Sequence, residues 1–164
     1  MAHTPMKRAT WILLLLVLVL SCGGIIWLYR SGLGPRIQED LTDPRIYAYR
    51  DWQSVGLQVN EGDVIHIRAS GQWLYTPGEF HGPEGHARYP APDTYPVPGA
   101  DIPGGVLLAR IGEDGPPLLV GRGRTLMASQ SGRLYFRIND DILTDNEGYV
   151  TVEVSVDKAT PPGE

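Results

Sequence analysis

Cysteine is nearly absent from this 164-residue chain, which contains only Cys22. A single cysteine excludes an internal disulfide and the paired-cysteine spacing of a structural zinc site. The sequence also lacks a G-x-S-x-G motif, and no cysteine follows the hydrophobic N-terminal stretch, so the usual arrangements for a catalytic nucleophile are missing. We therefore expect a binding protein rather than an enzyme.

Positive charge is scarce beyond residue 30. Residues 31–164 contain eleven Lys and Arg against nineteen Asp and Glu, which gives a net charge of −8. Nucleic acids and anionic lipid surfaces bind proteins through basic faces. The acidic composition therefore argues against nucleic acid as a partner of this part of the chain.

Long hydrophobic runs are lacking too, except for WILLLLVLVLSCGGIIWLY at residues 11–29. These nineteen uncharged residues would span a bilayer as a helix. Aromatic residues near both ends suit the membrane interface, and Lys7 and Arg8 before the run favour a cytoplasmic N-terminus. We expect residues 1–10 in the cytoplasm, a transmembrane anchor at 11–29, and a periplasmic or otherwise extracytoplasmic C-terminal domain.

Two other interpretations of this segment also place the domain outside the cytoplasm. The sequence VLSCG at residues 19–23 resembles a lipoprotein cleavage site, in which Cys22 would carry the lipid. A cleaved signal peptide would instead use the shorter apolar run that ends at Leu20. Whichever applies, glycine, proline and mixed charges predict a linker at 30–44, and residues 159–164 form a C-terminal tail.

The rest of the chain shows residue patterns typical of β-strands rather than of helices. Glycine and proline are abundant, with 20 and 14 residues, and no long stretch after the hydrophobic run follows a helical period. Apolar and polar residues alternate instead at 57–60, 64–70, 134–139 and 150–156, and 106–111 is a short run that is apolar except for Arg110. About eight short strands predict an all-β, jelly-roll-like β-sandwich over residues 45–158.

The segment 77–105 interrupts this pattern. It includes seven Pro and six Gly and shows almost no alternation. Loops of this length are usually functional or disordered. Four of its side chains suit contact with a ligand, namely His81, His86, Tyr89 and Tyr95. The two histidines are candidate metal ligands, and the simpler expectation is that both are exposed to solvent.

The densest polar segment is NDDILTDNEG at residues 139–148, between two predicted strands. Calcium takes about six to eight oxygen ligands, and this segment offers the side chains of Asp140, Asp145 and Asn146. It does not match an EF-hand loop, because the spacing differs and no helices flank it. The simpler alternative is an acidic hairpin turn whose side chains bond to their own backbone.

Five short segments, taken in order, resemble the PA-IL (LecA-type) galactophilic lectin family. They are GDVIHIRASGQWLYTP at 62–77, GPEG at 82–85, GVLLARIG at 105–112, GRLYFRIND at 132–140 and DNEG at 145–148. The resemblance covers roughly residues 52–156. It implies a jelly-roll β-sandwich that binds a saccharide through one calcium ion.

The resemblance also implies a set of ligands. Calcium would take the backbone carbonyls of Tyr75 and Leu143 and the side chains of Asp140, Asp145 and Asn146. Two adjacent sugar hydroxyls would complete the shell as neutral oxygen ligands. Asp140 and Asp145 would therefore lie next to the bound sugar as well as the ion.

Two positions depart from the family. Tyr89 and Pro92 stand where the family has a sugar-contacting histidine and glutamine, and the loop from Asp140 to Asp145 is shorter. Pro92 has no hydrogen-bonding side chain, while Tyr89 can stack on the apolar face of a sugar. We predict a membrane-anchored, calcium-assisted carbohydrate-binding module of the cell envelope. The alternative is an envelope protein-interaction or structural module that has lost sugar binding.

Overall fold

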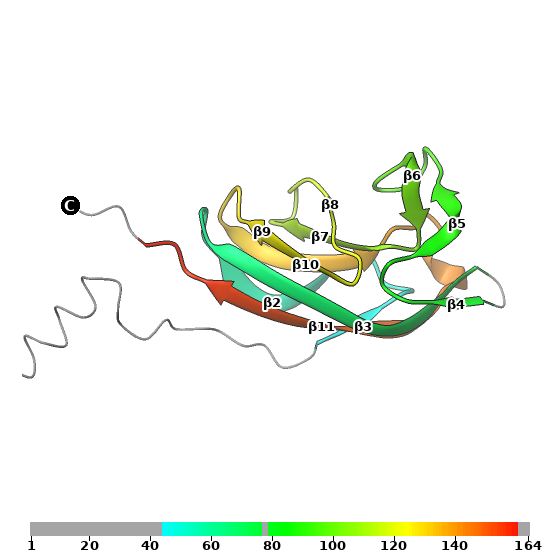
Figure 1. The fold of residues 1–164 in the computed structure, drawn as a ribbon, viewed down its shortest axis with the longest axis horizontal. Helices are drawn as coiled ribbons and strands as arrows, with labels where there is room; N and C mark the ends of the chain where they lie inside the picture. The colour runs from blue at the N-terminus through cyan, green and yellow to red at the C-terminus, as the bar shows by residue number, and fades with distance from the viewer. Residues whose placement is uncertain (1–43, 77–78, 161–164) are drawn as a thin grey trace, which may run out of the picture. The chain divides into compact units, whose positions relative to one another are not determined.

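The computed structural model describes residues 44–76 and 79–160 (Figure 1). The strands of this part are β1 (Arg45–Tyr47), β2 (Gln53–Val59), β3 (Val64–Thr76), β4 (Glu79–His81), β5 (His86–Ala91), β6 (Gly99–Gly104), β7 (Leu107–Ile111), β8 (Leu118–Leu119), β9 (Gly123–Met127), β10 (Gly132–Ile138) and β11 (Glu147–Asp157). One 3-10 helix, η1 (Leu143–Asp145), precedes β11.

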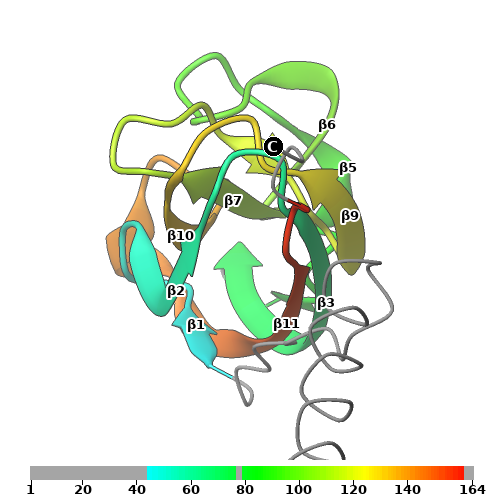
Figure 2. The same cartoon turned by 90° about the vertical axis from the view of Figure 1, so that its left-hand side faces the viewer.

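Two antiparallel sheets enclose the core. One has the order β1-β11-β3-β4, with β9 also paired to β3, and the other has the order β2-β10-β7-β8. Figure 2 shows β2, β10 and β7 on one side and β11 and β3 on the other. Buried apolar side chains from both sheets form one cluster between them, as in a β-sandwich. A third sheet, made of β5 and β6, lies at one end of the sandwich (Figure 1).

Period-two alternation explains how β11 buries one face. Its four valines, Val150, Val152, Val154 and Val156, are at most 3% exposed, and the residues between them lie toward solvent. Because side chains alternate across a strand, this spacing directs every valine into the core. β-branched side chains also favour the extended backbone.

β3 is longer than the sequence pattern predicts. The alternation in the sequence covers 64–70, but β3 runs on through Gly71 from Val64 to Thr76. Gly71 has a φ of 100° and lies opposite Val150 in the register with β11. A side chain at Gly71 would press on the Tyr149 carbonyl at 3.3 Å, so the glycine permits continuous pairing rather than ending it.

The segment 77–105 contains strands that its composition did not predict. β4, β5 and β6 all lie within it, and Pro90 pairs with Pro103 between β5 and β6. Proline cannot donate to a sheet hydrogen bond, so it is tolerated in edge strands and irregular pairs such as this one. The register between β5 and β6 is correspondingly irregular.

The expected fold class needs one correction. The all-β sandwich is found, but no helix among residues 44–76 and 79–160 has the length and apolar character needed to cross a membrane. The helix of this part is the three-residue η1, and its remaining regular structure is strand. The fold assigned to these residues is therefore all-β, without the transmembrane helix that was expected in the fold class. The segment 11–29 and Cys22 lie outside the described residues.

Candidate functional site

Strand pairing brings the two predicted ligand segments together. β3 and β11 are antiparallel, and their register begins with Glu147 opposite Leu74. Tyr75 follows Leu74, and Asn146 precedes Glu147, so the two lie next to each other at the end of this ladder. Residues separated by about seventy positions in the sequence therefore converge at the end of the sandwich that also carries β4 and β5 (Figure 1).

Tyr75 occupies an irregular point in the sheet. The register between β3 and β4 shifts between Leu74 and Thr76, so Tyr75 has no opposite residue in the described pairings of β3. Bulges of this kind redirect a residue out of the regular ladder. The ring of Tyr75 is buried, and a side chain at Gly104 or Gly105 would collide with it. The two glycines thus provide the space for this ring.

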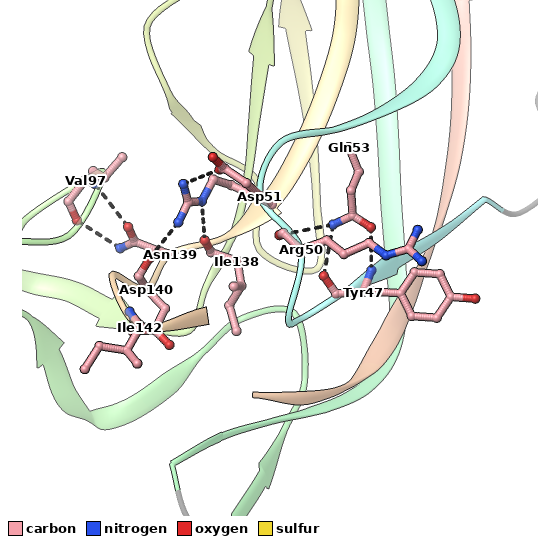
Figure 3. Close-up of polar contacts among 10 residues, drawn as sticks. Tyr47, Arg50, Asp51, Gln53, Val97, Ile138, Asn139, Asp140 and Ile142 are labelled. Atoms are coloured by element: carbon pink, nitrogen blue, oxygen red, sulfur yellow. Dashed lines mark hydrogen bonds and ion pairs between the residues drawn. The ribbon is translucent and has the colours of Figure 1, made fainter. Parts of the chain in front are cut away.

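Asp140 and Asn146 are both buried and contact each other. The Nδ2 atom of Asn146 donates to Oδ2 of Asp140 at 2.6 Å and to the Ile142 carbonyl at 3.2 Å. The Ile142 amide donates to Oδ1 of Asp140 at 3.3 Å, and Figure 3 shows these two residues side by side. These bonds close residues 140–146, hereafter the acidic loop, around the Asp140 carboxylate.

One acceptor in the acidic loop lacks a partner. Within the described part of the chain, Oδ1 of Asn146 is buried and accepts no hydrogen bond. Leaving a polar atom buried and unpaired costs about 1–3 kcal/mol, so native proteins usually pair such atoms with protein, water or an ion. An oxygen in this state is a suitable ligand for a cation.

A pair of tyrosine hydroxyls lies against the acidic loop. The hydroxyl oxygens of Tyr75 and Tyr95 are 2.8 Å apart. Burial raises the pKa of Tyr95 far above its ordinary value, and hydrogen bonds with Tyr75 and Asp140 raise it further. Tyr95 therefore stays protonated and can donate to the Asp140 carboxylate.

Negative charge accumulates around Tyr75. Burial raises the pKa of its hydroxyl; the hydrogen bond with Tyr95 opposes this change. Three nearby carboxylates add to the increase, those of Asp140, Asp141 and Asp145. A group of carboxylates close enough to act on one buried hydroxyl would attract a cation.

Asn139 and Arg137 hold the acidic loop in place. The Asn139 side chain accepts from the Val97 amide at 3.0 Å and donates to the Val97 carbonyl at 2.9 Å (Figure 3). Arg137 donates to the Asp140 carbonyl at 2.7 Å and forms an ion pair with Asp51 at 2.6 Å. Burial lowers the pKa of Arg137, and Asp51 and Asp140 partly offset this effect. Sequence reasoning gave these two residues no role, although Asn139 directly precedes Asp140.

The remaining predicted ligands are placed less centrally. The Leu143 side chain packs against the core, and its carbonyl accepts from the Asn146 amide at 3.4 Å. Asp145 is exposed, and its charge acts on Tyr75. Tyr89 lies on β5 and is 49% exposed. Its ring contacts His86 rather than the acidic loop.

A row of rings connects Tyr89 to the acidic loop. The rings follow the order Tyr95, Tyr75, His81, His86 and Tyr89. Neighbouring centroids are 6.3 Å apart in each of the first two steps and 4.2 Å apart in each of the last two. We call these five residues the aromatic row. The expectation that His81 and His86 are exposed is wrong, since His86 is buried and His81 nearly so.

Comparison of the sequence with protein-family models and with curated proteins gave no match. A solved structure described as the EclA N-terminal domain, a PllA-like lectin, is similar in fold. The two superimpose with a TM-score of 0.55 and 23% sequence identity, over 70% of this chain and 95% of that chain. At this identity the likeness concerns the fold, and the described domain therefore has a lectin-like β-fold.

Proposed function

We propose that this domain binds a carbohydrate and that a calcium ion held by the acidic loop assists the binding. The lectin-like fold supports the first part. The single observation that carries the second is the buried, unpartnered Oδ1 atom of Asn146 beside the Asp140 carboxylate, within the residues that the structure describes. The proposed activity is binding without turnover.

The available donors fit calcium, which prefers hard oxygen ligands. Asp140 offers a carboxylate and Asn146 an amide oxygen. Tyr75 offers a backbone carbonyl at an irregular point of β3, where the ladder leaves it without an opposite residue in the described pairings. Asp145 adds a second carboxylate, and the Leu143 carbonyl has a second lone pair beyond its bond to the Asn146 amide. A bound calcium ion would attract the hydroxyl oxygens of a sugar through its positive charge.

Tyr89 is suited to the apolar face of a sugar. About half of this side chain is exposed, and its ring is backed by His86 at 4.2 Å between centroids. Aromatic rings held in this way present a rigid apolar surface at a low cost in conformational entropy. We therefore propose Tyr89 as a contact of the bound sugar.

Thermal unfolding with and without calcium tests the ion. We expect calcium to raise the melting temperature of the wild-type protein by several degrees over a chelator, because ligand at a hundredfold excess over Kd stabilises by about 2.7 kcal/mol. Asp140→Asn should abolish most of this shift. Asp114→Asn removes the same charge from an exposed residue outside the acidic loop and should retain the shift.

An equal calcium response in both variants would contradict the proposed ligands, and no response in the wild type would contradict calcium binding. The second result would favour the other candidate function, a protein-interaction or structural module. One observation supports that candidate: both carboxylate oxygens of Asp140 accept hydrogen bonds from protein donors, Nδ2 of Asn146 and the Ile142 amide.

A further inference from the structure

Three potential metal ligands meet where β4 turns into β5, apart from the acidic loop. Oε2 of Glu79 lies 2.9 Å from Nε2 of His86 and 3.6 Å from Nε2 of His81. One ligand atom from each of the three residues lies within 4.8 Å of the others. We call Glu79, His81 and His86 the His–Glu cluster.

One nitrogen of this cluster is buried without a partner. Among the described residues, Nε2 of His81 makes no hydrogen bond and is inaccessible to solvent, while the whole side chain is 15% exposed. Its separation of 3.6 Å from Glu79 is too long for a good hydrogen bond. A buried imidazole nitrogen that points at a carboxylate and a second imidazole suggests a missing ligand.

The spacing suits a tetrahedral metal ion. Zinc binds His nitrogen and carboxylate oxygen at about 2.0–2.2 Å, which places neighbouring donors about 3.4 Å apart. The two separations from Glu79, 2.9 and 3.6 Å, lie on either side of this value. Imidazole ligands favour zinc and similar transition metals over calcium or magnesium.

Metal binding is compatible with the hydrogen bonds around the cluster, except that His86 would lose one of them. Burial lowers the pKa of His81, and the nearby His86 lowers it further, so His81 is neutral at pH 7 and has a free lone pair. The Arg88 amide donates to Nδ1 of His86 at 3.0 Å, which leaves the proton of neutral His86 on Nε2, facing Glu79. A metal at Nε2 requires the other tautomer of neutral His86, with its proton on Nδ1, and the Arg88 amide must then give up its bond to Nδ1.

We propose that Glu79, His81 and His86 form a binding site for a zinc-class transition-metal ion. Three protein ligands leave one coordination position for water or another ligand. The site requires neither calcium nor sugar, and so it does not depend on the proposed function.

Backbone hydrogen bonds hold the turn that joins the two strands of the His–Glu cluster. Glu79 and His81 lie on β4, in the five-stranded sheet, and His86 lies on β5, in the two-stranded sheet. The turn between them is held by a bond from the Gly85 amide to the Gly82 carbonyl at 3.1 Å. It is also tied to β7 by a bond from the Leu107 amide to the Pro83 carbonyl at 2.8 Å. A bound ion would therefore clamp the two-stranded sheet to the sandwich.

Zinc titration of the chelator-treated full-length protein tests the site. We expect zinc alone to raise the melting temperature, and cobalt to give the visible absorption of tetrahedral nitrogen and oxygen ligation. Glu79→Ala and His81→Gln should each weaken zinc affinity by more than about 10-fold. The exposed His66, which pairs with Thr125 and Asp157 on other strands, provides the control, and His66→Gln should retain full affinity.

Circular dichroism checks that each variant is folded, and Glu79 offers a mild change because half of its side chain is exposed. The Arg88 amide resonance should shift with zinc in the wild type. Equal zinc affinity in all variants, or no zinc response in the wild type, would overturn the proposal. Glu79→Ala should retain any calcium response and Asp140→Asn the zinc response, so failure of one site is distinguishable from failure of the other.

Discussion

At the scale of single residues, Asp63 shows how a buried carboxylate shapes the turn between β2 and β3. Its Oδ2 atom accepts from the Asn60 amide and its Oδ1 atom from the Ala159 amide, both at 2.8 Å. Lys158 lies 3.5 Å away. Burial opposes ionisation, but the two amides and the ammonium outweigh it, so the pKa of Asp63 lies below its ordinary value.

We expect Asp63→Asn to lower the free energy of unfolding by about 1–3 kcal/mol at pH 7, because one amide donor loses its acceptor. A carboxyl group with a lowered folded pKa stabilises fully above its unfolded pKa of about 3.9. The difference from wild type should therefore persist down to about pH 4 and shrink as the pH falls through the folded pKa. Urea denaturation at several pH values measures it.

Asp114→Asn, at an exposed carboxylate, is the matched control and should change little at any pH. A difference between Asp63→Asn and wild type that stayed constant down to pH 3 would show that the Asp63 charge is not its source.

The oxygen-rich side chains of the acidic loop could be predicted from the sequence, but the residues packed around them could not. Asp140, Asp145 and Asn146 stand out because they are oxygen-rich and lie between two strands. Tyr95 was noticed as a possible ligand contact, yet its bond to Tyr75 depends on tertiary packing of a proline-rich segment. No local pattern encodes that contact.

At the scale of elements, burial distinguishes the two phenylalanines of the chain. Phe136 on β10 is fully buried between the sheets, whereas Phe80 on β4 is 57% exposed. We expect Phe136→Ala to cost about 3–5 kcal/mol of unfolding free energy, since it leaves a core cavity. Phe80→Ala should change it by less than about 0.5 kcal/mol. Chemical denaturation compares the two, and similar losses would contradict the sandwich packing described above.

Strands with a regular alternation were predictable, and strands in the segment 77–105 were not. β11 and β10 carry apolar residues at every second position, which is sufficient to identify them. β5 and β6 contain prolines and glycines and pair with each other, and the segment between them is held by the contact of Val97 with Asn139. Such long-range pairing overrides local propensity.

At the scale of the whole molecule, antiparallel pairing of β3 and β11 explains why distant segments meet. The order of segments along the chain suggested a lectin-like sandwich, and the fold agrees with that. The His–Glu cluster was harder to foresee. His81 and His86 were candidate metal ligands, but no local pattern indicated that a proline-rich segment would bury them against Glu79.

Carbohydrate binding is the central claim, and a glycan array tests it most directly. We expect the purified protein to bind at least one glycan in calcium, to lose that binding in a chelator, and to release the glycan unaltered. Asp140→Asn should bind no glycan, while Asp114→Asn, outside the acidic loop, should bind as the wild type does. If the folded wild-type protein bound no glycan on a broad array in the presence of calcium, this result would contradict the proposed function.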